Sequence, residues 1–275
     1  MLNYSGVGFQ FGRIKVSLST QKYSIRLRYF IAFSYFGKSY HGWQKQPNAS
    51  TVQQVMEETL STLLRQTVEV MGAGRTDAGV HARQMYAHFE VEEIKDTEDL
   101  CYRMNAFLPE DIAISGIYQV PDDAHARFDA VERTYEYWIV QEKNPFYIDS
   151  AHYIKYNLDV DKMNEAASLL LRYTDFECFS KSNTDVKTFL CKLKKAEWTI
   201  QGDLLVFTIT ADRFLRNMVR AIVGTLLEVG LGKSTLEDVE EIINSKDRSR
   251  AGVSVPAKGL YLTKVSYPSH IKLDS

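Results

Sequence analysis

The chain has 275 residues, of which 45% are hydrophobic and 25% charged, and its formal net charge is −2. A chain of this length and composition can bury one large core or two smaller ones, which excludes a largely disordered protein. No apolar run approaches the roughly 20 residues of a membrane-spanning helix, and neither a signal peptide nor a disulfide framework is evident, so we expect a cytoplasmic protein.

In the first half of the chain, the sequence predicts strands and helices around a glycine-rich loop. Residues 25–33 alternate apolar and polar side chains, which indicates a strand. A helix follows, with Ser50 or Thr51 as its N-cap and Gln53 or Gln54 at the capping-box position. Strands are expected over 68–72 and 84–92, and a second helix over 98–107.

The second half shows a comparable order of elements. A strand is expected over 132–140, a helix over 163–171, and a hairpin that turns at Gly202. A long helix over 214–229 would place Arg213, Arg216 and Arg220 on one side, and Ser234 with Glu237 would cap a shorter helix. The last strand covers 259–267. We therefore expect an N-terminal extension (1–25), two α/β domains (26–128 and 129–268) and a tail (269–275).

The charge is unevenly distributed along the chain. Residues 1–30 carry five basic residues and no acid, residues 181–195 carry five lysines and one aspartate, and residues 90–111 carry eight acids and two basic residues. A nearly neutral total thus leaves room for a basic face that contacts phosphates, although runs of charge are more often solvated surface.

Residues 72–82, "GAGRTDAGVHA", set a single carboxylate, Asp77, among small residues. The glycine spacing does not fit a dinucleotide loop, because Asp77 stands where GxGxxG needs glycine, and the "GKST" of 232–235 lacks the first glycine of a P-loop. The histidines show no metal-ligand spacing. The sequence therefore predicts neither a nucleotide cofactor nor a metal.

Asp77 is suited to be a nucleophile or a general base. Small neighbours allow a bulky substrate to approach the carboxylate closely, and Arg75 would hold it charged and oriented. The alternative is that Arg75 and Asp77 only stabilise a tight turn. The residues alone leave both interpretations open.

Longer segments resemble the tRNA pseudouridine synthase A family. "GRTDAGVHA" is similar to its signature, "SYHGWQKQP" to its opening, "MNAFLPEDIAI" to its middle and "HARFDAVERTYEYWI" to its central strand. "FLRNMVRAIVGTLLEVG" and "PAKGLYLTKVSYP" resemble its long helix and closing strand. These segments occur in the family's order over residues 26–268.

The resemblance implies the pseudouridine synthase fold, in which two α/β halves share a mostly antiparallel sheet with a central cleft. It implies a homodimer without cofactor or metal. Asp77 would be the catalytic carboxylate, and Arg75 would take part in extruding the base and pair with Asp77. Tyr135 would pack on the uracil, while Arg220 and Leu260 would form walls of the active site.

The implied activity is isomerisation of uridine to pseudouridine in the anticodon stem-loop of tRNA, at positions 38–40. Tyr135 would stack on the extruded base, and its hydroxyl could also accept the C5 proton. The alternatives are a related synthase with another position specificity and a tRNA-binding chaperone without catalysis. Two departures from the family pattern are Phe36, where the family usually carries aspartate, and the additional residues 1–25.

Overall fold

The protein, analysed as a computed structural model, is described here over residues 26–181, 186–271 and 273. The expected N-terminal extension, residues 1–25, lies outside this part. The first half of the chain forms β1 (Leu27–Tyr35), α1 (Val52–Leu64), β2 (Met71–Gly72), β3 (His81–Val91), α2 (Thr97–Phe107) and β4 (Ile112–Val120). The second half forms β5 (Glu132–Val140), β6 (His152–Tyr153), α3 (Val160–Leu170), β7 (Leu193–Gln201), β8 (Leu204–Ala211), α4 (Met218–Gly230), α5 (Leu236–Ser245) and β9 (Leu260–Ser266).

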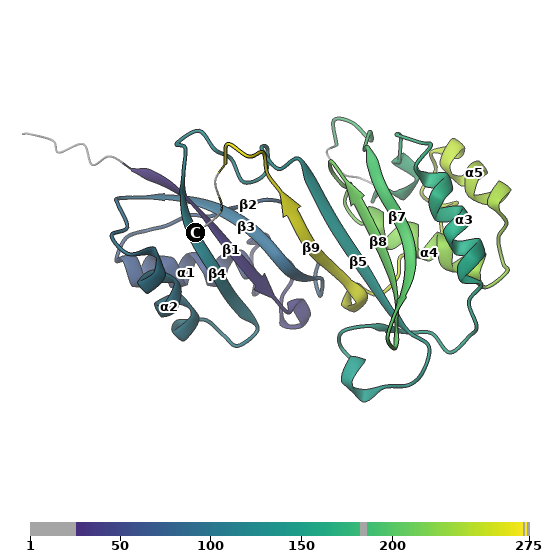
Figure 1. Cartoon of the computed structure of the whole chain (residues 1–275), viewed down its shortest axis with the longest axis horizontal. Helices are drawn as coiled ribbons and strands as arrows, with labels where there is room; N and C mark the ends of the chain where they lie inside the picture. The colour runs from purple at the N-terminus through teal and green to yellow at the C-terminus, as the bar shows by residue number, and fades with distance from the viewer. Residues whose placement is uncertain (1–25, 182–185, 272, 274–275) are drawn as a thin grey trace, which may run out of the picture.

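One sheet of nine strands extends through the described part of the molecule (Figure 1). Its main order is β4-β1-β3-β9-β5-β8-β7, while β2 pairs with β3 and β6 with β5. Neighbouring strands are antiparallel except for β3 with β9 and β5 with β6. The expectation of a mixed α/β fold with a mostly antiparallel sheet is therefore confirmed.

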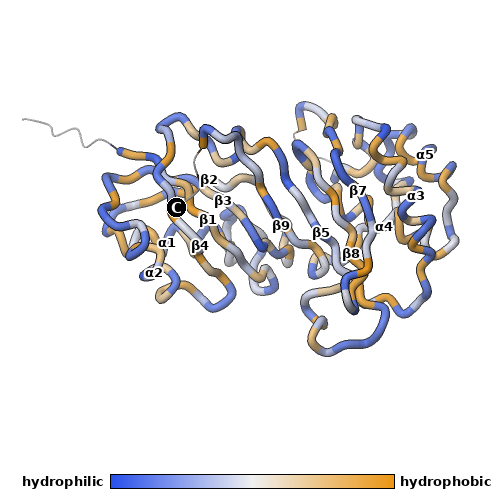
Figure 2. The backbone as a smooth tube through the Cα atoms, in the orientation of Figure 1, coloured by the Kyte–Doolittle hydropathy of each residue, from blue (hydrophilic) through white to orange (hydrophobic). Residues whose placement is uncertain are grey.

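The buried side chains form two cores, one mainly from each half, and Leu262 and Val265 of β9 belong to the core of the first half. α1 and α2 pack on the sheet of the first half, and α3, α4 and α5 pack in the second (Figure 1). Hydrophobic residues recur along β8, and on β4 they alternate with polar or exposed positions, as a half-buried strand requires (Figure 2). None of the described helices is long and apolar enough to cross a membrane.

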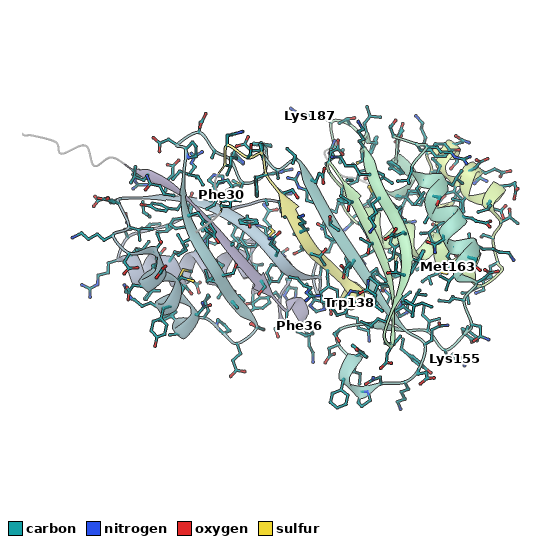
Figure 3. All side chains as sticks on the ribbon, in the orientation of Figure 1. Phe30, Phe36, Trp138, Lys155, Met163 and Lys187 are labelled. Carbon is teal, nitrogen blue, oxygen red and sulfur yellow. The ribbon has the colours of Figure 1, made fainter. Side chains whose placement is uncertain are left out.

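The last strand joins the two halves, because β9 lies between β3 and β5. It pairs with β3 through only two residue pairs, His81 with Tyr261 and Ala82 with Leu262. Aromatic side chains reinforce this joint. Phe36 stacks on His81 at 4.1 Å, His81 contacts Tyr261 at 4.7 Å, and Tyr261 stacks on Trp138 at 4.1 Å between ring centroids. Figure 3 labels Phe36 and Trp138, the two ends of this stack.

His81 also connects the halves by hydrogen bonds, and it is 1% exposed. Its Nδ1 accepts from the backbone N–H of Gly37 at 2.9 Å, so its Nε2 donates to the carbonyl of Lys258 at 3.1 Å. Burial lowers the pKa of His81, which favours this neutral form. Because the Phe36 ring stacks on His81, Phe36 takes part in the contact between the two halves.

Several expected helix starts are wrong by one to four residues, and α3, for example, begins at Val160 rather than 163. α4 begins at Met218 rather than 214, because Asn217 precedes it in the left-handed region with φ 67°. Arg213 and Arg216 consequently lie before the helix and do not form a helical stripe with Arg220. The capping box of α5 is made by Thr235 and Asp238, one residue later than expected, while Thr51 caps α1.

Gly224 provides a test of the packing between α4 and residues 251–256. A Cβ on Gly224 would lie 2.0 Å from the carbonyl oxygen of Val253, a contact that only movement of the backbone can relieve. Alanine in place of glycine normally stabilises a helix interior by about 1 kcal/mol. We expect Gly224→Ala instead to lower the free energy of unfolding by about 1–3 kcal/mol, measured by urea denaturation.

The matched control is Gly230→Ala in the same helix. There the Cβ would meet the Sδ atom of Met163 at 2.3 Å, and a flexible methionine can move away. Its loss of stability should be smaller. Equal stabilisation of both variants would contradict the proposed tight contact at Gly224.

Candidate active site

The loop that carries Asp77 connects β2 to β3 and is held by backbone contacts. The N–H of Trp43 donates to the carbonyl of Thr76 at 3.2 Å, and the N–H of Gly79 donates to the carbonyl of Tyr40 at 3.2 Å. Gly42, with φ 88°, approaches so closely that a Cβ would lie 2.3 Å from the Thr76 carbonyl oxygen. The segment around Gly42 therefore positions the Asp77 loop from one side.

A buried pair of hydroxyl groups supports the same loop. The Tyr35 hydroxyl and Thr76 Oγ1 are 2.8 Å apart, and the two residues are 4% and 9% exposed. Burial raises the pKa of Tyr35, so its hydroxyl remains protonated and can donate. Thr76 precedes Asp77 directly, and this contact fixes the backbone from which the carboxylate projects.

Two arginines from the second half of the chain flank the Asp77 carboxylate. Arg216 Nε lies 3.5 Å from Oδ1, and Arg220 Nη1 lies 3.8 Å from Oδ2. Arg220 is anchored, because its Nε donates to the carbonyl of Val255 at 2.7 Å. The Arg216 side chain is 60% exposed, against 22% for Arg220 and 27% for Asp77. The carboxylate thus sits between two positive charges and stays accessible to solvent.

The expected pairing of Arg75 with Asp77 is corrected by these contacts. Among the described residues, the guanidinium groups within 4 Å of the Asp77 carboxylate belong to Arg216 and Arg220, and Arg75 is exposed. Proximity in sequence suggested Arg75, whereas the sheet brings the segment 212–220 against the loop. Sequence reasoning had linked Arg220 to the pocket of Asp77 only through the family resemblance.

Tyr135, on β5, lies in the same electrostatic environment as Asp77. Burial, with a further contribution from the Asp77 charge, raises the pKa of Tyr135 to about 12, so its hydroxyl is neutral at pH 7. Its ring packs edge-to-face on Phe214 at 5.1 Å. Tyr135 also packs against both cores, which places it at the junction of the two halves.

Of the two leucines in "GLYL", Leu262 is the one opposite Tyr135 in the β5–β9 ladder, and Leu260 is opposite Tyr137. Leu260 is 6% exposed and belongs to the core of the second half. Tyr137 is fully buried and its hydroxyl donates to the Pro256 carbonyl at 2.9 Å. Leu260 therefore lies two residue pairs further along the ladder than Leu262, the residue opposite Tyr135.

Arg133 is a residue of the site to which sequence reasoning gave no role of its own. Its Nη1 donates to the carbonyls of Ala130 at 2.7 Å and Asp212 at 2.9 Å, and its Nη2 donates to those of Ala73 at 3.0 Å and Arg127 at 2.6 Å. The Arg133 guanidinium thus binds the backbone of three segments, around residues 73, 127–130 and 212. The sequence feature that could have pointed to Arg133 was its position two residues before Tyr135 in the segment "HARFDAVERTYEYWI".

The fold and the site together define a class of protein. A loop from one α/β half presents an accessible carboxylate to two arginines and a tyrosine of the other half, over a continuous, mostly antiparallel sheet. This arrangement is suited to an enzyme that uses a carboxylate as nucleophile or base and a tyrosine as a stacking surface.

Comparisons with known proteins identify the family. The sequence profile described as tRNA pseudouridine synthase matches residues 31–129 and 166–268. The tRNA pseudouridine synthase A of Bacteroides thetaiotaomicron is 53% identical over 247 residues, covering 89% of this chain and 92% of its own length. That of Porphyromonas gingivalis is 53% identical over 250 residues, covering 90% and 99%. That of Francisella tularensis is 38% identical over 242 residues, covering 87% and 94%. The chain belongs to the tRNA pseudouridine synthase family.

The hydrogen bond between the hydroxyls of Tyr35 and Thr76 leads to a prediction on stability. Thr76→Val leaves the Tyr35 hydroxyl buried without its partner, which should cost about 1–3 kcal/mol of unfolding free energy. The double variant Tyr35→Phe/Thr76→Val removes both polar groups and should cost less than the sum of the single variants. Urea denaturation measures the cycle, and Thr76→Ser is the control that keeps a hydroxyl. Strictly additive losses would show that the two groups do not interact.

Proposed function

We propose that the protein isomerises uridine to pseudouridine in tRNA, with Asp77 as the catalytic carboxylate. The observation that carries this proposal is the assembly of Asp77, Arg220 and Tyr135 from separate segments at the junction of the two halves. The similarity to the family over both halves supports the same reaction. The activity is that of an isomerase.

The reaction breaks the bond between N1 of uracil and C1′ of ribose, turns the base, and forms a bond between C5 and C1′. The C5 proton is lost and N1 gains one, so the change needs no oxidant or reductant. Asp77 acts by attacking C1′ or the uracil ring, or by assisting the loss of a ribose proton. Its distances of 3.5 and 3.8 Å to the arginines leave carboxylate lone pairs for such a step.

The uridine must leave the RNA stack before Asp77 reaches it, at a cost of a few kcal/mol. Stacking on Tyr135 offsets part of this cost, by about 1–3 kcal/mol per base. Arg75, exposed on the same loop as Asp77, is suited to enter the RNA as the base leaves. Arg220 positions the carboxylate, and Leu260 supports the wall behind Tyr135 through the β5–β9 ladder.

The proposed target is the anticodon stem-loop of tRNA. We further propose that the protein works as a homodimer in the cytoplasm. The assembled site favours catalysis over the alternative of a binding chaperone, because binding alone does not require a carboxylate among arginines. A synthase with another position specificity would use the same chemistry. Mapping the modified positions in tRNA from a deletion strain distinguishes these possibilities.

Removal of the Asp77 charge tests the proposed mechanism. Asp77→Asn keeps the shape of a partly exposed side chain, so the variant should fold with an unchanged melting temperature. It should release no tritium from tRNA labelled at C5 of uracil, a loss of roughly 10⁴-fold or more. Wild-type rates of release by this variant would exclude Asp77 from the mechanism.

The role of the Tyr135 ring is tested by a pair of substitutions. Tyr135→Leu removes the stacking surface and should weaken binding of tRNA by about 1–3 kcal/mol, whereas Tyr135→Phe should keep the affinity. Equilibrium binding measures both. If the leucine variant binds tRNA as tightly as the phenylalanine variant, the ring does not stack on the base. If Tyr135→Phe keeps the affinity but releases tritium more slowly than wild type, the hydroxyl takes part in proton transfer.

A further inference from the structure

Three exposed arginines lie near one another at the Asp77 loop, and each comes from a different segment of the chain. Arg75 lies on the loop between β2 and β3, Arg127 on the connection between β4 and β5, and Arg216 immediately before α4. All three are more exposed than Arg220, which is only partly exposed. They are available to a ligand that approaches from solvent.

The bonds of Arg133 explain why these segments meet. Its Nη2 holds the carbonyls of Ala73 and Arg127 together, at 3.0 and 2.6 Å, and its Nη1 holds the carbonyl of Asp212 at 2.9 Å. Ala73 is two residues from Arg75, and Asp212 is four residues from Arg216. Arg133 thus gathers the backbones from which the three exposed arginines project.

Positive charge is in excess at this place. The pKa of Arg75 is lowered by burial and, in addition, by the charges of Arg127 and Arg216, which lie close enough to repel it. The Arg127 guanidinium lies 5.6 Å from the centre of the Phe128 ring, and no carboxylate of the described residues pairs with Arg75 or Arg127.

The acids of the neighbouring segments, Asp129 and Asp212, bind backbone N–H groups and form no ion pair with Arg75 or Arg127. A carboxylate oxygen of Asp129 accepts from the backbone N–H of His125 at 2.7 Å. Asp212 Oδ1 accepts from the backbone N–H groups of Lys192 and Arg213 at 2.8 and 2.7 Å. Clustered guanidinium groups, of which Arg75 and Arg127 form no ion pair with the described residues, are suited to bind phosphates beside a nucleotide site.

We propose that Arg127 and Arg216 bind the backbone phosphates that flank the nucleotide attacked by Asp77. This inference rests on the proposed function and adds the residues that hold the RNA strand. An extruded nucleotide remains linked to the strand through its two phosphates, and a guanidinium binds a phosphate through two parallel hydrogen bonds. Arg216 is 60% exposed and lies 3.5 Å from Asp77, so it can exchange the carboxylate for a phosphate and leave Arg220 as the fixed partner.

The test measures binding of tRNA to Arg127→Gln and Arg216→Gln across a range of KCl concentrations. The tRNA is first incubated with wild-type protein, so that no turnover occurs during the measurement. Each variant should bind about tenfold more weakly, and the slope of log Kd against log salt should fall by about 0.7, because one phosphate contact is lost. The control is Arg103→Gln on α2, where the arginine pairs with Asp99, and it should change neither quantity. An unchanged slope in both variants would overturn the proposal.

Kinetics separate phosphate binding from an effect on Asp77. At saturating protein, the fold loss in single-turnover tritium release by Arg127→Gln should be smaller than its fold loss in affinity, and lysine in place of Arg216 should restore most of the salt slope. If Arg216→Gln keeps the binding slope but slows tritium release, Arg216 serves Asp77 and not the phosphate. A wild-type protein that binds tRNA with a steep salt dependence and releases no tritium would contradict the proposed function, while the phosphate site would stand.

Discussion

The insertion of β9 between β3 and β5 is the constraint on which the remaining structure depends. Without this strand the two halves would end in unpaired edges, since β3 and β5 have no direct contact in the sheet order. The ladder between β3 and β9 contains only two residue pairs. The stack from Phe36 to Trp138 and the hydrogen bonds of His81 therefore carry much of the connection.

The rigidity of this joint matters for the site, because its parts come from both halves. Asp77 belongs to the first half, whereas Tyr135, Arg216 and Arg220 belong to the second. A small rotation of one half against the other would change the distances of 3.5 and 3.8 Å between the carboxylate and the guanidiniums. Arg133 limits such a rotation, since it binds the carbonyl of Ala73 in one half and that of Asp212 in the other.

Close backbone packing, in turn, sets the position of Arg220. Gly224 and Gly252 allow residues 251–256 to lie against α4, and the N–H of Gly252 donates to the buried hydroxyl of Thr225 at 2.9 Å. Asn217 Nδ2 donates to Ser254 Oγ at 2.7 Å on the same segment. These contacts place the Val255 carbonyl where Arg220 Nε donates to it. The fold therefore orients the Arg220 side chain before any substrate is present.

The sequence by itself determined the strands and helices within a few residues and singled out Asp77 as a candidate carboxylate, and its resemblance pointed to Tyr135 and to the family. These features are written in local patterns: period-two alternation in 25–33, small residues around Asp77, and caps such as Thr51. Only the tertiary structure decided that Arg216 and Arg220, rather than Arg75, flank Asp77, and that Arg133 ties three segments together. The physical reason is that local patterns reflect backbone preferences and burial, whereas the partner of a charged side chain depends on which distant segments the strand order places side by side.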